Sequence, residues 1–417
     1  MNVYGVAITV ALVVDYVLHT AAAVLNTRVL SRPVPDEVAS LYGEEGLRRA
    51  RNYVRAVSWD GFVERSVLLL LVFVFWFSGG FSWLDTLVRQ WFTSELLRGL
   101  AYLGLLAVAH SAVSIPFDMY RTFVVETRFG FNLTTWQTFV ADRVKGLALA
   151  VLLGGGLLAG LLSLFLHFGS SAWLWCWVVV VVFSLIIQWL GPSLILPLFN
   201  QFEPMPDGEL KDAITRYATS VRFPLRSVYL VDGSRRSTRA NAYFTGLGRR
   251  RRIALFDTLV QKHSTAEIVS VLAHEIGHYR LRHTAKGLLF GAAHAGIALF
   301  LFSVLLEHPA LQQALLVAEP SLHVGLVGFV LLYTPVETAL SALANRLSRK
   351  HEAAADRFAL DTAPSPESLA NAIKHLSAVN LAHPNPHWFH VGLNYSHPPL
   401  AQRLHAIHAY LEDARRA

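Results

Sequence analysis

The sequence predicts a mainly α-helical membrane protein, with about seven transmembrane helices and polar segments that carry a small β-sheet. Hydrophobic residues make up 53% of the 417 residues, and charged residues only 16%. Soluble domains contain about a quarter charged residues, so lipid is the expected solvent for much of this chain. Long apolar runs, each near the roughly 20 residues that a helix needs to cross the hydrocarbon, alternate with basic and polar segments.

The apolar runs are the candidates for spanning helices. The first contains Asp15 and has no basic leader or evident cleavage site, so we interpret it as a retained helix rather than a signal peptide. His294 and Glu337 lie in the last two runs, and polar groups in a span usually face a bundle interior or a watery cavity. The runs are Val3–Leu25, Val67–Leu84, Leu97–Ile115, Gly146–His167, Ala172–Leu190, Ala285–Leu306 and Leu322–Leu343.

Basic residues gather in alternate loops, after the first, third and fifth runs, whereas the loops after the fourth and sixth contain neither Lys nor Arg. The positive-inside rule then predicts an extracytoplasmic N-terminus and a cytoplasmic C-terminus, with the polar segments on the cytoplasmic side. The same rule accounts for the net charge of +7 without a nucleic acid partner. The basic residues are Arg28, Arg32, Arg48, Arg49, Arg51 and Arg55, then Arg121, Arg128, Arg143 and Lys145, then Arg235, Arg236, Arg239 and Arg249–Arg252.

Two polar segments divide the chain into four expected parts. Residues 1–190 hold five spans with cytoplasmic loops, 191–284 form a cytoplasmic α/β part, 285–343 hold two spans, and 344–417 form a helical C-terminal part. β-branched and aromatic residues between polar or glycine borders predict short strands at Ser227–Val231, Ala240–Thr245 and Arg252–Phe256. Helices are expected at Asp212–Thr219, Thr265–His283, Ser348–Thr362, Pro366–Val379 and Ala401–Asp413.

The clearest chemical motif is His274-Glu275-Ile-Gly-His278, which has the pattern HExxH. On a helix, residues four apart lie on one face, so the imidazoles of His274 and His278 can bind one ion. Two histidines and a carboxylate are the ligands of many catalytic zinc ions, whose fourth position stays open for water. Glu275 follows the first ligand and is the expected general base.

HExxH is short enough to occur by chance on an ordinary helix surface. Three features favour a metal site instead. The apolar residues Ile268–Ala273 predict that the helix is buried, and Gly277, which costs about 1 kcal/mol relative to Ala in a helix, indicates that another segment approaches closely. A third ligand is available at Glu352, while Asp356 shares its helical face and is expected to hydrogen-bond a ligand histidine.

With these residues, the chain resembles the type I CAAX prenyl protease family, the membrane zinc peptidases that trim prenylated proteins. The resemblance covers nearly the whole chain and follows the order of the family's motifs. The matching residues are Pro116–Tyr120, Glu126–Asn132, Asp142 with Lys145, Pro197–Asn200, Asn241–Gly246, Leu255–Thr258 and Ser396–Pro398.

The resemblance implies a helix bundle around a large hydrated chamber, with a gluzincin-like metallopeptidase domain and one Zn²⁺ at its cytoplasmic end. It implies that His397 steadies the oxyanion of the tetrahedral intermediate. Asp356 is assigned a proton-donor role in some members; we favour orientation of a ligand. Supporting roles are expected for Asn345, Arg349 and Arg403, with Arg403 pairing to a carboxylate. The strand that binds the substrate backbone as an added strand is expected at Asn241, Ala242, Tyr243 and Phe244.

The expected reaction is hydrolysis of a peptide bond near the C-terminus of a peptide or protein substrate at the membrane. The loop Glu307–Ser321 lacks the long insertion of some family members, and such a short loop would suit a bacterial member. Because bacteria usually lack prenylated proteins, prenylation of the substrate is left open. One alternative is an HtpX-like quality-control peptidase, although those are shorter and lack the Phe129–Asn132 region. The other is a non-catalytic membrane scaffold or transporter, which the intact HExxH and Glu352 oppose.

The remaining histidines are interpreted more plainly. His283 and His294 follow the HExxH motif on the way into the membrane, and packed or water-bonded side chains are the favoured interpretation. A loop contains His383, His387 and His390. Their irregular spacing and the lack of a carboxylate favour an ordinary loop over a second metal site.

Overall fold

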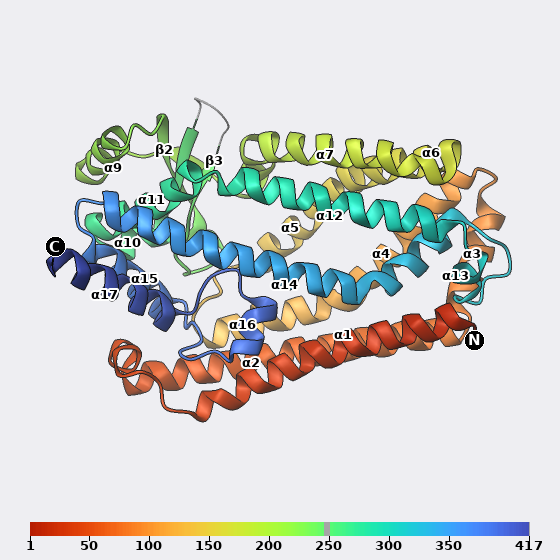
Figure 1. Ribbon diagram of the computed structural model, residues 1–417, viewed down its shortest axis with the longest axis horizontal. Coiled ribbons are helices and arrows are strands. Elements are labelled where there is room, and N and C mark those ends of the chain that lie inside the picture. Colours follow the sequence, from red (N-terminus) through yellow and green to blue (C-terminus); the bar gives the residue numbers. More distant parts are fainter. Residues whose placement is uncertain (246–250, 417) are drawn as a thin grey trace.

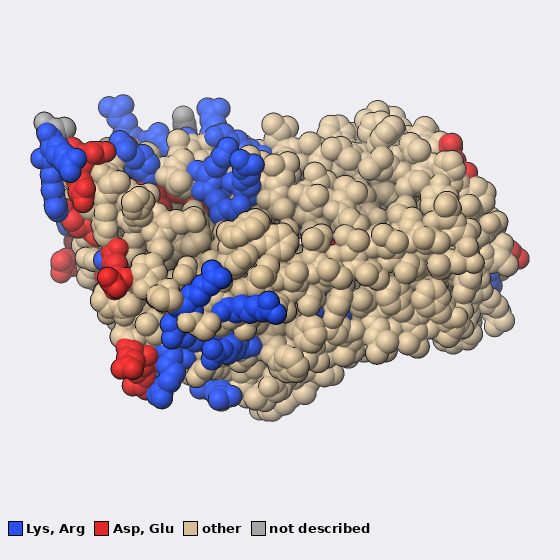
Figure 2. All heavy atoms as spheres, turned by 60° about the horizontal axis from the view of Figure 1, so that its bottom comes forward, with Lys and Arg blue, Asp and Glu red and all other residues tan. Residues whose placement is uncertain are grey.

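Long helices run side by side along the molecule, and a smaller part that contains the β-sheet lies at one end (Figure 1). The computed structural model describes residues 1–245 and 251–416, and for 243–245 and 251 only the backbone. The two termini lie at opposite ends of the molecule. Charged side chains gather at the end that carries the C-terminus, and most of the remaining visible face is uncharged (Figure 2). The molecule therefore has a polar end and a long apolar body.

The apolar body is built from helices that coincide with all seven predicted runs. Five helical stretches are long and apolar enough to cross a membrane, or six if one bent pair counts as a span. One stretch, Trp136–Phe199, holds two predicted runs, because its α6 and α7 fold back against each other. The helices are α1 (Val3–Arg28), α2 (Asp36–Phe77), α3 (Gly80–Trp91), α4 (Glu95–Tyr120), α5 (Trp136–Leu149), α6 (Gly156–Phe168), α7 (Trp173–Leu190), α12 (His283–Leu306) and α14 (Leu322–Thr362).

The second predicted run is a bent pair rather than one helix. The chain turns by 67° between α2 and α3. Gly79 has a φ of +81°, a left-handed conformation that glycine adopts at little cost. A Cβ on the next residue, Gly80, would lie 2.4 Å from the ring of Phe75, so the bend also needs the small residue there.

Polar contacts join the spanning helices to α14. His294 on α12 lies 2.9 Å from the Glu337 carboxylate, and Thr338 donates a hydrogen bond of 2.5 Å to Asp15 on α1. Such pairs satisfy polar groups where water is scarce. Between 6% and 17% of the residues in the most apolar part of each span are buried within the protein, as expected for helices whose outer faces contact lipid. The chamber stays a prediction.

The sheet has four strands in the order β1-β2-β4-β3. β2 (Leu225–Val231) and β4 (Arg251–Phe256) are parallel, and β3 (Ala242–Thr245) pairs antiparallel with β4. The three predicted strands are present, whereas β1 (Phe202–Pro204) was not predicted because it is short and contains a proline. β3 is an edge strand in the described part of the chain. Gly246 of the family motif and Arg249 and Arg250 of the basic run lie outside the described residues.

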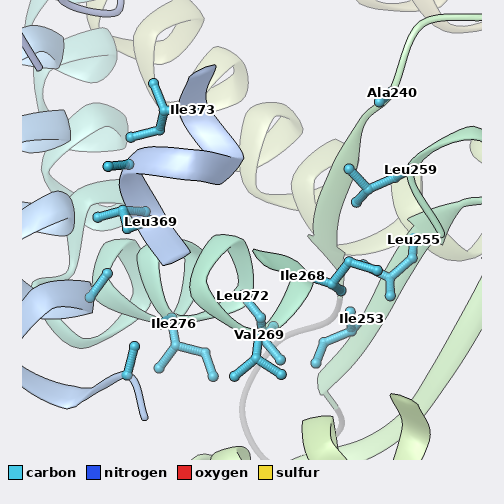
Figure 3. Close-up of a cluster of buried hydrophobic side chains, with 14 of the residues drawn as sticks. Ala240, Ile253, Leu255, Leu259, Ile268, Val269, Leu272, Ile276, Leu369 and Ile373 are labelled. Carbon is cyan, nitrogen blue, oxygen red and sulfur yellow. The ribbon is translucent and has the colours of Figure 1, made fainter. Parts of the chain in front are cut away.

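Helix α11 (Thr265–Arg280) carries HExxH and is buried between the sheet and α15 (Glu367–Val379) (Figure 3). Its N-terminus is closed by a capping box, in which Ser264 and Glu267 bond each other's backbone N–H groups. Ile268, Leu272 and Ile276 are each 2% exposed or less. The apolar face that the sequence predicted therefore fixes α11 in the core of the polar end.

Several helix boundaries differ from the prediction by one to three residues, as at α9 (Glu209–Ser220) and α17 (Leu400–Arg416), and two differences affect the part around the HExxH helix. α11 ends at Arg280 rather than His283, because Arg282 adopts a left-handed conformation (φ 57°) and the chain then enters α12. The predicted helix Ser348–Thr362 is not separate, since α14 continues from its apolar run through the polar end as one 41-residue helix. The other described C-terminal helices are α16 (Trp388–Asn394), which was not predicted, and α17 (Leu400–Arg416).

At Gly277, α14 approaches α11 closely. A Cβ at this position would lie 3.1 Å from the Ala355 Cα and 3.2 Å from its carbonyl oxygen. We expect Gly277→Ala to lower the free energy of unfolding by about 1–3 kcal/mol, because the two backbones must separate. Thermal melting in detergent measures the change. Gly287→Ala on α12 is the control, since nothing lies within 4 Å of its Cβ; equal melting of the two variants would contradict the close approach.

Candidate metal centre

Helices α11 and α14 bring three potential ligands to one point. The His274 Nε2 and His278 Nε2 atoms are 3.1 Å apart. The carboxylate of Glu352 lies 3.3 Å from His274 Nε2 through one oxygen and 3.2 Å from His278 Nε2 through the other. All three ligand atoms lie within 4.8 Å of one another, and Glu352 is only 4% exposed. The structure thus brings together the three ligands predicted from the sequence.

The two carboxylates around His274 favour positive charge between them. His274 Nδ1 donates a hydrogen bond of 2.8 Å to the Asp356 carboxylate, and its Nε2 faces the buried Glu352 Oε2 at 3.3 Å. Burial acts to lower the pKa of His274, but the contacts with Asp356 and Glu352 raise it to about 9. A metal ion bound by His274 Nε2 and Glu352 would take the place of that proton. The site therefore has the electrostatics of a metal centre.

Asp356 connects the ligand His274 to Arg403 on α17. Its carboxylate accepts two hydrogen bonds from the Arg403 guanidinium, of 2.8 and 2.6 Å, in addition to the one from His274. Charge-assisted bidentate pairs of this kind are geometrically specific. Arg403 therefore fixes Asp356, and Asp356 fixes the ring of His274.

The contact between Asp356 and His274 gives a measurable prediction. Asp356→Asn should weaken metal binding by about 10–100-fold, because the amide no longer holds the ring of His274 as firmly. Competition with a chelator measures the affinity. Asp361→Asn is a matched control on the same helix, where the carboxylate contacts Arg357 and Tyr410 at the surface. Unchanged affinity in Asp356→Asn would show that the ring is oriented by other contacts.

Glu275 directly follows the ligand His274 on α11 and is half-buried. Burial raises the pKa of its carboxyl group above the ordinary value, and the neighbouring histidines act in the opposite direction. A carboxylate with a raised pKa holds a proton more strongly than an exposed one, which suits an acceptor of protons at neutral pH. Its position in the site is therefore compatible with a general base.

His397 lies at the ligand cluster although it is far along the chain. Its Nε2 atom is 3.3 Å from Glu352 Oε1, and its Nδ1 atom is 2.9 Å from the Ser396 hydroxyl. The side chain is 63% exposed, so it remains accessible from solvent beside the ligand cluster.

Asn345 and Arg349 act on the loop rather than on the ligands. The Asn345 amide donates to the Leu393 carbonyl at 2.7 Å, and Arg349 donates to the carbonyls of Val391 and Tyr395 at 3.0 and 2.5 Å. These carbonyls belong to α16 and the residues that follow it, just before His397. Of the three residues expected to support the ligands, only Arg403 does so, through Asp356.

The predicted substrate strand lies at the edge of the sheet, in β3. The Asn241 carbonyl accepts a hydrogen bond from the Phe256 N–H, and Ala242 pairs with Leu255. The side chains of Tyr243 and Phe244 lie outside the described residues. The backbone of β3 therefore pairs on one side only within the described residues.

Two further histidines adjoin the site and were not assigned to it from the sequence. His283 Nδ1 lies 2.9 Å from His278 Nδ1, and the His283 ring stacks on His351 with 4.1 Å between ring centres. Arg282, between His278 on α11 and His283 on α12, is not helical. Helical spacing could therefore not reveal the contact between these two histidines.

Family models match two adjoining parts of the chain. Residues 24–201 match the CAAX prenyl protease N-terminal model, described as five membrane helices, and residues 204–411 match peptidase family M48. Together they cover both the apolar body and the polar end that carries the metal centre.

Relatives and a solved structure match over most of their length. The CAAX prenyl protease 1 homolog of Oryza sativa subsp. japonica is 31% identical over 99% of this chain and 98% of its own. CAAX prenyl protease 1 of Saccharomyces cerevisiae is 36% identical over 77% and 74%. A crystal structure of S. mikatae Ste24p has a TM-score of 0.90 at 31% identity, covering 98% and 99% of the two chains. The chain therefore belongs to peptidase family M48, as a multi-pass membrane metalloprotease of the CAAX prenyl protease 1 family.

Proposed function

We propose that the chain is a zinc endopeptidase that cleaves prenylated, membrane-associated proteins near their C-terminus. The observation that carries the proposal is the buried cluster of His274, His278 and Glu352, with Glu275 beside it, at the polar end of a membrane protein. The relatives are named as CAAX prenyl proteases, which supports a CAAX-type substrate.

Zinc suits the ligand set better than other common ions. Two imidazoles and one carboxylate are ligands that zinc prefers, and magnesium or calcium would need mainly oxygen ligands. Tetrahedral zinc spaces its ligand atoms about 3.3–3.6 Å apart, given bonds of about 2.0–2.2 Å. The two imidazole nitrogens are 3.1 Å apart, and each lies 3.2–3.3 Å from a different oxygen of Glu352. One ligand atom from each residue lies within 4.8 Å of the others, which supports a common ion.

The residues of the chain have distinct roles in the proposed reaction. His274, His278 and Glu352 would hold a zinc ion, which would supply Lewis acidity to the attacking water and to the scissile carbonyl. Glu275 accepts the proton of the attacking water and passes it to the leaving amine. His397, accessible from solvent beside the ligand cluster, donates a hydrogen bond to the carbonyl oxygen as negative charge develops there.

The substrate is proposed to bind along β3. This edge strand can accept an extended peptide as an added strand, whose main-chain groups pair with the free edge. The lipid is proposed to lie among the apolar helices, in the chamber, where a prenyl chain avoids water. The charged end with the metal centre is proposed to face the cytoplasm, as the positive-inside rule predicts.

A pair of peptides tests the proposal. Purified protein should cleave a farnesylated CAAX peptide, lose that activity with a zinc chelator, recover it with zinc, and cleave the unprenylated twin far more slowly. Cleavage products are identified by mass spectrometry. Equal cleavage of the two peptides would reject the prenyl specificity and favour a general membrane peptidase of the quality-control type. Absence of cleavage in zinc-loaded protein would reject CAAX peptides as the substrate.

A further inference from the structure

A second group of metal-binding side chains lies at the other end of α11. Within the described residues, His263, Glu267 and His375 place one ligand atom each within 4.8 Å of one another. His263 directly follows α10 (Asp257–Lys262), Glu267 is in the first turn of α11, and His375 is on α15. Glu267 precedes the ligand His274 by about two helical turns, roughly 10 Å along the axis, so one ion cannot serve both groups.

His263 is the observation that points to a ligand. Its side chain is 1% exposed, and neither ring nitrogen has a hydrogen-bond partner. An imidazole left in this state loses about 1–3 kcal/mol for each unsatisfied group. Burial lowers the pKa of His263. The Glu267 carboxylate raises it, but His375 and Lys262 lower it further. The ring is therefore kept in the neutral form that binds metals.

The Glu267 carboxylate lies between the two imidazoles. Its Oε1 atom is 2.7 Å from His375 Nδ1, and its Oε2 atom is 3.7 Å from His263 Nδ1. Oε2 also accepts hydrogen bonds from the backbone N–H and hydroxyl of Ser264, which fix the carboxylate in place. Glu267 is 6% exposed, whereas the His375 side chain is 54% exposed and leaves a route to solvent.

We propose that His263, Glu267 and His375 bind a second divalent transition-metal ion, with zinc as the preferred one. The two imidazoles and one carboxylate form the same kind of donor set as the peptidase site. The ion would join α10, α11 and α15, and so fix the start of the helix that carries HExxH. The role of this second ion is structural. The proposal of the ion does not depend on which substrate the peptidase site cleaves.

The site differs from the loop histidines noted in the sequence. His383 Nε2 lies 3.0 Å from the Asn26 carbonyl, and its Nδ1 accepts from the Asn385 N–H. His387 Nδ1 accepts from the Phe389 N–H at the start of α16. These nitrogens are already used in hydrogen bonds, whereas those of His263 are not.

Metal content tests the proposal on the full-length protein. After dialysis against excess zinc and removal of free ion, the natural chain should hold about two zinc ions and His375→Gln about one, measured by mass spectrometry of the metal. Glu352→Gln should also hold about one, because it loses the other ion. His408→Gln is the matched control, a half-exposed histidine 3.4 Å from the Glu37 carboxylate, and should keep two.

A second variant guards against a folding defect. Glu267→Gln keeps the capping box, since glutamine serves at this position as well, but removes the charged ligand. It should lose the same ion as His375→Gln. Zinc should raise the melting temperature of the natural chain through both ions. The share of this rise that comes from the second ion should remain in Glu352→Gln and be absent from Glu267→Gln and His375→Gln. Equal zinc content in His375→Gln, His408→Gln and the natural chain would overturn the proposal. One ion in the natural chain, lost completely in Glu352→Gln, would overturn it too.

Discussion

Replacing Glu275 by glutamine is expected to slow peptide hydrolysis by about 10²–10⁴-fold while the chain keeps its zinc. Glutamine has nearly the same shape as glutamate, so the helix and the neighbouring ligand His274 keep their positions. It cannot accept a proton, and the attacking water then loses its base. Cleavage of the farnesylated peptide measures the rate, and metal analysis of the same sample shows whether the ion remains.

The comparison variant for this experiment is Glu412→Gln, an exposed carboxylate on α17 that contacts only Arg416 among the described ion pairs. It should cleave at the rate of the natural chain. If Glu275→Gln retained zinc and turned over normally, Glu275 would not be the general base, and another acceptor of the proton would be needed.

Replacing Glu352 by glutamine should weaken zinc binding at the peptidase site by more than about 100-fold. Loss of a group that only hydrogen-bonds a ligand, such as Asp356, costs roughly 10–100-fold. The variant removes a ligand and its negative charge, and leaves two imidazole nitrogens 3.1 Å apart with less to offset their repulsion. Activity should fall with the metal content and should return only in part at high zinc concentration. Competition with a chelator of known affinity gives the size of the loss.

Glu337→Gln controls for a general effect on α14. Glu337 is on the same helix, about four turns before Glu352, and also pairs with a histidine, His294, at 2.9 Å. This variant should keep the zinc affinity of the natural chain. A similar loss in both variants would mean that a displaced α14, rather than a missing ligand, explains the result.

Local patterns explain why most of the fold was predictable. Each spanning segment is a mainly apolar run, and run length is a property of consecutive residues. The bend at Gly79 lies inside an apolar run, where run length alone does not distinguish one helix from two, and a Cβ on Gly80 would meet Phe75 there. β1 is stabilised by pairing with β2 rather than by its own three residues. Its position depends on a contact between distant segments, which the sequence did not reveal.

The same distinction applies to the site. His274, Glu275 and His278 were identified by the HExxH motif and its helical spacing, and Glu352 as a downstream carboxylate that shares a helical face with Asp356. The role of His397 rested only on the resemblance, and the group of His263, Glu267 and His375 was missed. His263 and Glu267 are four apart, but His375 comes to them only through the packing of α15 on α11.

The length of α14 links the thickness of the bilayer to the geometry of catalysis. His323, near its first residue, contacts Asp85 of α3 at the far end of the molecule, and Glu352 lies about 44 Å further along the same helix. The partner ligands are on α11, which does not enter the apolar body. A helix that tilts to match a thinner or thicker membrane therefore transmits strain to its contact with α11, where Gly277 meets Ala355 beside the ligands. We expect turnover to depend on the acyl-chain length of the lipid in which the enzyme is reconstituted.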